Sequence, residues 1–380
     1  MNPATKKTHL LSGAILLLSS VMIFLYGRID PGDSRYSEWD LHYYRQIARN
    51  APDLPSQVPE PFSYRILGPF LVGALPFPTD TAFYGLAIFC ALILPVLLFY
   101  FLKTHSIRNS VAFPTTLFFL CNTYIYGFNV WDPYQINDTI SLILLLVMFW
   151  SLSKGNFAAF AIAAAVSAFA RELFLLFIPV GLVFFAEKGE LKQKTVPFII
   201  ATVPALLLFI ALRIAISSPA DKGLTYYFTA FFEHVPKIYS FNTWFRILIN
   251  AFAPFSLVPI VFGDQTKAFI RNNKYMIVFA LLVFISSLFG GDNERLVAPA
   301  FAVFYLLMAR IIQNEPFFTP AVRGILLVMA FLNSLHHSIA RYPVVPRNGT
   351  IALTIGTTLG TAILLLFLKS KGSERSEEMV

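Results

Sequence analysis

The sequence has few charged residues, few cysteines and none of the common motifs of soluble enzymes. Only 13% of its 380 residues are Asp, Glu, Lys or Arg, against roughly a quarter in soluble domains. Its two cysteines, Cys90 and Cys121, lie inside apolar runs, so we interpret them as small packing residues rather than metal ligands. No His-Glu-x-x-His motif, Gly-rich phosphate loop or Gly-x-Ser-x-Gly elbow occurs. These absences disfavour chemistry that uses cytosolic ATP or a nucleotide-sugar, and they indicate no metal site.

Hydrophobic residues make up 57% of the chain and form apolar runs from one end to the other. Runs such as 140–150 and 199–212 are continuous, whereas the strands of a membrane barrel alternate apolar and polar residues. Because a lipid-exposed backbone must satisfy its own polar groups, continuous runs predict helices. We therefore expect an all-α, polytopic transmembrane bundle of about 10–13 helices. The expected spans are roughly 9–27, 81–102, 111–129, 138–152, 157–169, 173–186, 195–214, 243–262, 275–289, 296–310, 323–340 and 350–368.

Three segments need separate interpretation. The apolar run 10–26 follows two lysines, as in a secretory signal, but no convincing small-residue cleavage site follows it, so we expect an uncleaved first helix. Segment 66–77 is short and broken by Pro and Gly, and we expect it to dip into the membrane or lie along it. Segment 157–186 is interrupted by an Arg-Glu pair, which favours two short helices, with one long tilted helix as the alternative.

Lysine predicts the orientation of the chain. With the N-terminus in the cytoplasm, only Lys222 and Lys237 fall on the outer side, which is the positive-inside pattern. The lysines expected inside are Lys6, Lys7, Lys103, Lys154, Lys188, Lys192, Lys194, Lys267, Lys274, Lys369 and Lys371. Residues 1–369 then form one transmembrane domain with a first extracytoplasmic loop at about 28–65, and 370–380 form a short cytoplasmic tail without regular structure. The net charge of +8 is thus explained without a nucleic-acid partner.

Arginine is distributed in the opposite way. Those expected on or near the outer face are Arg28, Arg35, Arg45, Arg49, Arg65, Arg171, Arg213, Arg246, Arg295, Arg341 and Arg347. A guanidinium group binds phosphate and carboxylate in fixed geometry, so this distribution indicates an anion-binding outer face. The alternative is that these arginines only pair with outer acids such as Asp33, Glu38 and Glu294.

The first outer loop is the longest and the richest in polar and aromatic residues. Trp39, Tyr43, Tyr44 and Ile47 have the spacing of one helix face, which predicts an interfacial helix anchored by aromatic rings. Asp40 stands at the start of this helix. Its carboxylate is either an N-cap or a base at the boundary between water and lipid.

Further ionisable residues lie near the expected outer ends of other spans. They are Arg65 at the end of the first loop, Asp132 in the second, the pair Arg171-Glu172, the pair Glu294-Arg295, and Arg341. Ionisable groups at membrane depth are costly and usually functional. For Arg171-Glu172 the alternative is a structural ion pair that closes two short helices.

The Trp39-Asp40-x-x-Tyr43-Tyr44 stretch, the acid Asp132 and the outer arginines resemble the GT-C superfamily of membrane glycosyltransferases, in particular its mannosyltransferase-like members. The resemblance implies an inverting hexosyltransferase that takes a sugar from a polyprenyl-phosphate carrier on the extracytoplasmic face. It also implies that Asp40 is the catalytic base. By the same resemblance, the second acid is Asp132, and the donor phosphate is bound by Arg65, Arg171, Arg295 and Arg341. The implied supporting residues are Glu172, Glu294, Trp39, Tyr43 and Tyr44, of which the aromatic rings stack on sugar or lipid.

The chain departs from the family pattern in two respects. It has no tight acidic pair and no C-terminal soluble domain, which leaves the use of a divalent metal and the recognition of the acceptor open. The expected partners are the lipid-linked donor and membrane lipids, and the expected location is a bacterial inner membrane, in a cell-envelope pathway. One alternative function is a lipid or solute transporter, for which inverted repeats would be expected. Another is an O-antigen polymerase or ligase, and a third is a structural membrane subunit.

Overall fold

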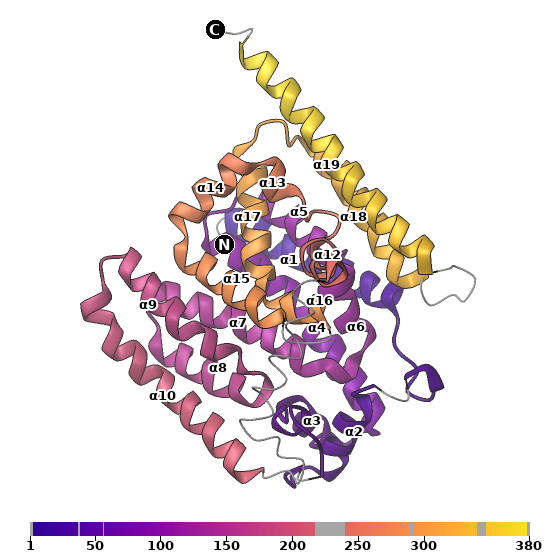
Figure 1. Cartoon of the computed structure of the whole chain (residues 1–380), viewed down its shortest axis with the longest axis vertical. Coiled ribbons are helices and arrows are strands. Elements are labelled where there is room, and N and C mark those ends of the chain that lie inside the picture. The colour runs from indigo at the N-terminus through magenta and orange to yellow at the C-terminus, as the bar shows by residue number, and fades with distance from the viewer. Residues whose placement is uncertain are drawn as a thin grey trace.

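The computed structural model describes residues 3–36, 39–55, 57–216, 240–288, 292–339 and 347–377. Within these ranges the chain is helical and contains no strand (Figure 1). The prediction of an all-α bundle is therefore confirmed.

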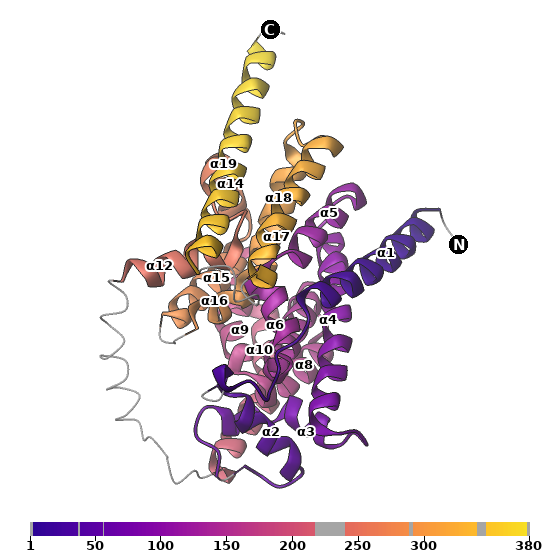
Figure 2. The ribbon, with the colours of Figure 1, turned by 90° about the vertical axis from the view of Figure 1, so that its right-hand side faces the viewer.

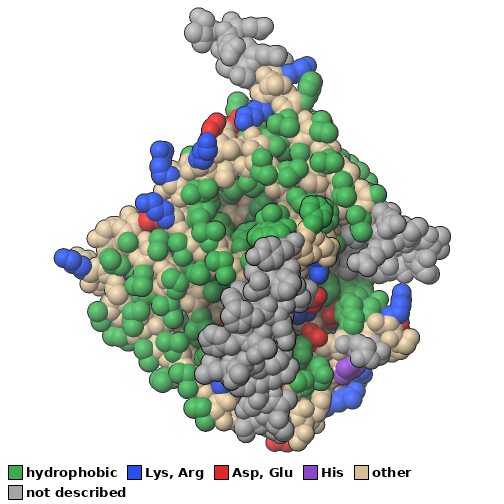
Figure 3. Space-filling view, viewed as in Figure 1, with side chains coloured by type: hydrophobic (Ala, Val, Ile, Leu, Met, Phe, Trp, Pro, Cys, Tyr) green, Lys and Arg blue, Asp and Glu red, His purple; other side chains and the backbone are tan. Residues whose placement is uncertain are grey.

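Six described helical segments are long and apolar enough to cross a membrane. They contain α1 (Pro3–Tyr26), α4 (Thr79–Thr104), α7 (Ile136–Lys154), α10 (Leu191–Ala215), α17 (Phe301–Asn314) and α19 (Arg347–Glu377). Two bent helix pairs raise the number of candidate spans to eight if each pair is counted as one broken span. Large apolar side chains such as Phe24 and Ile214 are more than two-thirds exposed, and apolar side chains cover much of the surface (Figure 3). Such a surface requires a lipid environment, so the chain is an integral membrane protein.

Two helix pairs are sharply bent, and the first of them replaces the straight span predicted at 111–129. In the first pair, α5 (Asn109–Leu120) meets η3 (Thr123–Gly127) and α6 (Phe128–Trp131) at 59°. In the second pair, α14 (Gly263–Asn272) meets α15 (Lys274–Ser287) at 105°. The predicted span 243–262 is wrong, because this stretch folds as α12 (Phe241–Leu248), η6 (Asn250–Phe252) and α13 (Val258–Val261). Its prolines at 254 and 259 lack the backbone N–H that a continuous helix needs.

Segment 157–186 folds as two helices, α8 (Phe157–Ala170) and α9 (Phe177–Glu187), joined through η5 (Glu172–Leu176). Between them, Arg171 has an extended backbone. The Arg171 side chain contacts Asp138 in the first turn of α7, whereas Lys188 lines the same cavity as Lys154 at the other end of α7. The segment therefore crosses the thickness of the bundle twice, which confirms the prediction of two short helices.

The first loop forms η1 (Ser34–Tyr36), α2 (Leu41–Asn50) and η2 (Phe62–Tyr64), and is followed by α3 (Leu67–Gly73). Helices α2 and α3 lie side by side at one end of the bundle (Figures 1 and 2). They approach so closely that a Cβ atom on Gly73 would clash with the carbonyl oxygen of Ala48. The side chains of Leu41, Tyr44 and Ile47 are almost completely buried in protein. The predicted helix is therefore present as α2, but its apolar face packs on the fold and does not anchor it in the membrane interface.

The remaining helices are α16 (Asn293–Val297), η4 (Pro133–Gln135), η7 (Ala298–Ala300) and α18 (Pro320–Ile339). Helices α18 and α19 pack against each other, and α19 extends beyond the bundle toward the C-terminus (Figure 2). Because α19 continues as a helix to Glu377, the expectation of an irregular tail is wrong for 370–377. Lys222 and Lys237, which the lysine pattern places outside, fall outside the described residues.

Candidate active site

The carboxylate of Asp40 meets the guanidinium group of Arg295, which is 255 positions away in the sequence. Asp40 Oδ2 lies 3.7 Å from Arg295 Nη2 and accepts a hydrogen bond of 3.3 Å from Gln135 Nε2. Asp40 occupies the N-cap position of α2, but its side chain makes no capping hydrogen bond. The structure therefore does not support the N-cap alternative, and three remote segments converge at this carboxylate.

A second, buried carboxylate holds two arginines together. Asp138 is 3% exposed; its Oδ1 lies 3.0 Å from Arg171 Nη1, and its Oδ2 lies 3.2 Å from Arg295 Nε. These contacts are ion pairs whose angles do not meet hydrogen-bond geometry. Arg295 also lies 3.4 Å from Asp292 through Nη1. Because an unpaired buried charge is very costly, Asp138 determines where both guanidinium groups lie.

Asp40 and Arg295 line a cavity of about 250 Å³, whose other lining residues are Trp39, Phe128, Gln135 and Asp292. The ring of Trp39 is oriented edge-on to Tyr36 and Trp131, at centroid distances of 5.0 and 5.8 Å. In the space-filling view, acidic and basic side chains gather in a hollow near α16 within a largely apolar face (Figure 3). The cavity thus combines a partly exposed carboxylate, a guanidinium group and an aromatic wall. We call it the Asp40–Arg295 cavity.

Asp132 is close enough to Asp40 and Arg295 for their charges to interact, and it is 1% exposed. Its Oδ1 accepts a hydrogen bond of 3.2 Å from the backbone N–H of Tyr134, and no hydrogen-bond partner for Oδ2 is found in the described ranges. Burial raises the pKa of Asp132 to about 7, although the positive charge of Arg295 opposes this rise. Asp132 is therefore a buried acid beside the charged cluster and does not line the cavity.

The other two predicted acids pair with arginines that the sequence analysis did not select. Glu172 Oε1 accepts a hydrogen bond of 2.8 Å from Arg213 Nη2. Burial would raise the pKa of Glu172, but the positive charges of Arg65 and Arg213 lower it below its ordinary value. Glu294 Oε2 accepts a hydrogen bond of 2.7 Å from Arg246 Nε. Both acids thus form ion pairs of their own, and neither lines the cavity.

Only one of the three predicted aromatic residues lines the cavity. Trp39 does so, whereas Tyr43 stacks on Phe62 at 5.0 Å and Tyr44 is fully buried. Arg65 lies among Tyr44, Glu172 and Asp138, close enough for their charges to interact. Arg341 falls outside the described residues.

Asp138, Gln135 and Asp292 contact or line the cluster around Asp40 and Arg295 but were not among the predicted site residues. A signal was present for Asp138, because it is a carboxylate directly before the apolar run 140–150, where an unpaired charge would be costly. The partner of that carboxylate was not visible in the sequence. Among the described residues, no three His, Cys, Asp or Glu side chains are arranged to hold a metal ion.

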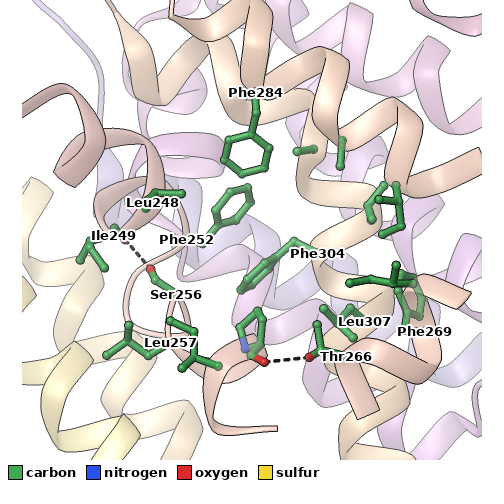
Figure 4. A pocket seen from close by; sticks show the side chains of 17 residues that line it. Leu248, Ile249, Phe252, Ser256, Leu257, Thr266, Phe269, Phe284, Phe304 and Leu307 are labelled. Atoms are coloured by element: carbon green, nitrogen blue, oxygen red, sulfur yellow. Dashed lines mark hydrogen bonds between the residues drawn. The ribbon is translucent and has the colours of Figure 1, made fainter. Parts of the chain in front are cut away.

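A second cavity is almost entirely apolar (Figure 4). Its volume is about 360 Å³, and its lining includes Leu248, Phe252, Phe284 and Phe304. Leu248 belongs to α12, the helix that also carries Arg246. The pair Arg246–Glu294 joins α12 to α16, next to Arg295. Helix α12 therefore contributes both to the wall of the apolar cavity and to the ion pairs beside Arg295.

No protein-family model and no curated protein sequence matches this chain. Among solved structures, ArnT from Cupriavidus metallidurans, crystallised bound to undecaprenyl phosphate, matches with a TM-score of 0.51. The match covers 96% of this chain and 72% of that chain at 13% sequence identity. The chain therefore shares the fold of ArnT, and this agrees with the fold that the resemblance to the GT-C superfamily implies.

Proposed function

We propose that this protein is a membrane glycosyltransferase that moves a sugar from a polyprenyl-phosphate carrier to an acceptor on the extracytoplasmic face. The observation that carries the proposal is the pairing of Asp40 with Arg295 at 3.7 Å in one cavity. The shared fold with ArnT, whose crystal structure contains undecaprenyl phosphate, supports a lipid-phosphate carrier. A carboxylate and a guanidinium group in one cavity supply the two roles that such a transfer needs.

In the proposed reaction, the acceptor hydroxyl oxygen attacks the anomeric carbon of the donor. Its proton passes to the carboxylate of Asp40, for which the two oxygens must approach within about 3 Å. The bond from the anomeric carbon to the phosphate oxygen breaks, and the electron pair leaves with the polyprenyl phosphate. Attack from the face opposite the leaving group inverts the anomeric centre.

Arg295 would stabilise the negative charge that develops on the leaving phosphate. It lines the cavity and remains charged at all physiological pH values. Arg171 is 8% exposed and pairs with Asp138, so we assign it the positioning of the cluster rather than direct contact with the donor. The apolar cavity beside α12 offers an environment for the hydrocarbon chain of the carrier (Figure 4).

Two variants separate the roles of Asp40 and Arg295. Asp40→Asn should still bind undecaprenyl phosphate, measured as a thermal shift of the purified protein. Undecaprenol, which lacks the phosphate, is the control ligand. The same variant should lose sugar transfer. Transfer is measured in membranes as the release of undecaprenyl phosphate from each of a panel of undecaprenyl-phosphate-linked sugars. Arg295→Gln should lose both the thermal shift and the transfer.

The matched controls are Asp33→Asn and Arg35→Gln, which alter an exposed ion pair of the same first loop. Both controls should bind and transfer as the wild type does. Wild-type transfer by Asp40→Asn, together with a wild-type thermal shift for Arg295→Gln, would overturn the proposal.

A further inference from the structure

The end of the bundle opposite the Asp40–Arg295 cavity contains a large basic cavity of about 610 Å³. The ends of α4, α7 and α9, the start of α15 and the end of α17 border it, and so does the last turn of α14. Asp138 and Lys154 lie near opposite ends of α7, which separates the two sites by about 24 Å at the rise of an α-helix. The basic cavity is therefore a separate site from the one that contains Asp40.

The described lining of this cavity contains five cationic side chains and one carboxylate, so its charge is strongly positive. Its cationic lining residues are Lys154, Lys188, Arg271, Lys274 and Arg310. The one carboxylate among the lining residues, Glu187, accepts hydrogen bonds from the backbone N–H groups of Lys274 and Tyr275, at 2.8 and 3.3 Å. Across the described ranges, no carboxylate lies within 4 Å of these five cations as an ion-pair partner. In Figure 3, basic side chains gather along the edge of the molecule near α9 and α14.

An apolar groove adjoins the basic cavity. It has a volume of about 410 Å³ and lies between α4 and α7, where its lining includes Leu97, Phe101 and Val147. Two more lining residues, Tyr100 and Trp150, are 36% and 41% exposed, as expected of aromatic residues at a membrane interface. Thr104 lines both the groove and the basic cavity, so the two spaces are neighbours.

We propose that these two spaces bind one anionic phospholipid of the surrounding bilayer, with its phosphate in the basic cavity and an acyl chain in the apolar groove. Basic pockets between membrane helices attract anionic headgroups, and the groove favours a lipid over a free phosphate because only a lipid has a chain to bury there. The lysine pattern predicts that this lipid belongs to the cytoplasmic leaflet. The site does not depend on the proposed glycosyltransferase activity.

The position of Trp150 in the groove provides a direct probe. Brominated phosphatidylglycerol should quench the fluorescence of Trp150 more strongly than brominated phosphatidylcholine, in purified protein reconstituted in nanodiscs of each composition. The Trp150 contribution is the difference between the wild type and Trp150→Phe. Inorganic phosphate should not displace the lipid.

The variant Arg271→Gln/Lys274→Gln should remove the preference for phosphatidylglycerol, because each cation near an anionic headgroup is worth about fivefold in affinity. The matched control, Lys192→Gln/Lys194→Gln, removes the same charge from the start of α10, outside the cavity. It should keep the preference. If the double variant does not fold, Arg271→Gln alone is measured and should weaken the preference about fivefold.

Three results would each overturn the proposal. The first is equal quenching by the two brominated lipids. The second is an equal loss of preference in the control, which would indicate diffuse surface charge. The third is full displacement of the lipid by inorganic phosphate, which would indicate a site for a free anion.

Discussion

Replacing Asp138 with asparagine tests whether one buried carboxylate organises the proposed active site. The substitution keeps the shape of the side chain and removes its charge. Asp138 is 3% exposed and contacts Arg171 and Arg295 at 3.0 and 3.2 Å. Arg295 keeps Asp40 and Asp292 as partners. Arg171 loses the carboxylate that forms its ion pair within 4 Å in the described part of the chain.

The magnitude follows from this difference between the two arginines. Removing one partner of a buried ion pair costs about 3–5 kcal/mol, because the remaining charge is left uncompensated. Asp138→Asn removes the carboxylate partner of Arg171 and one of the three carboxylate partners of Arg295. It should therefore lower the free energy of unfolding by about 3 kcal/mol or more. The unfolding midpoint should fall by about 5 °C or more. Transfer should fall about 100-fold, because displacing a catalytic group by about 1 Å has an effect of that size.

A double-mutant cycle separates charge compensation from other effects of the substitution. Arg171→Gln removes the deprived charge, so Asp138→Asn/Arg171→Gln should unfold at a higher temperature than Asp138→Asn alone. The coupling free energy should lie in the range of about 0.5–3 kcal/mol that residues in contact show. Unfolding is followed in detergent and transfer by discharge of the undecaprenyl-phosphate-linked sugars. The exposed pair Asp33–Arg35 serves as the control cycle and should show no measurable change.

A wild-type unfolding temperature and a wild-type transfer rate for Asp138→Asn would refute this reasoning. So would a double variant that is less stable than Asp138→Asn, because the charge on Arg171 would then not be the source of the instability.

Three further predictions follow from the same structure. The pKa of Asp132 is raised to about 7 from an ordinary 3.8, so its burial opposes folding increasingly as the pH rises from about 4 to about 7. Asp132→Asn should therefore gain more stability over the wild type at pH 8 than at pH 5. Equal differences in unfolding midpoint at the two pH values would contradict this prediction. Gly73→Ala should destabilise the protein by about 1–3 kcal/mol and weaken transfer, because the new methyl group would clash with the carbonyl oxygen of Ala48 and displace α2. The control is Gly85→Ala, whose new methyl group would have no atom within 4 Å. It should behave as the wild type in thermal unfolding and in transfer. Transfer should persist in EDTA, because the carboxylates of the Asp40–Arg295 cavity are paired with Arg295, and a loss of transfer that is restored by added divalent metal would contradict this expectation.

Much of the helical architecture could be predicted from the sequence because it depends on local pattern. Continuous apolar runs specify helices in a bilayer whatever surrounds them, and the runs within α4, α7 and α10 are therefore recovered as spans. The charged pair Arg171-Glu172 interrupts an apolar run, and the chain breaks there. The span predicted at 243–262 failed because hydropathy counts apolar residues and does not register missing backbone donors, so the prolines at 254 and 259 were overlooked.

Which charges meet is a property of the tertiary structure. Asp40 and Arg295 had the residue types that the chemistry needs, and their contact depends on how α2 and α16 pack. Glu172 and Glu294 are also acids near the expected outer face, but they pair with Arg213 and Arg246. The partners of such long-range ion pairs cannot be predicted from sequence periodicity, because they depend on how distant segments pack in three dimensions.

The sequence by itself determined that the protein is a helical membrane bundle, since the hydrophobic effect and backbone hydrogen bonding act on each segment locally. It also specified which residues were able to carry charge chemistry. Only the tertiary structure decided that Asp138 joins Arg171 to Arg295, and that Tyr44 is buried instead of lining the cavity. Both outcomes depend on contacts between distant segments, where burial makes an unpaired charge too costly to persist and therefore selects the partner.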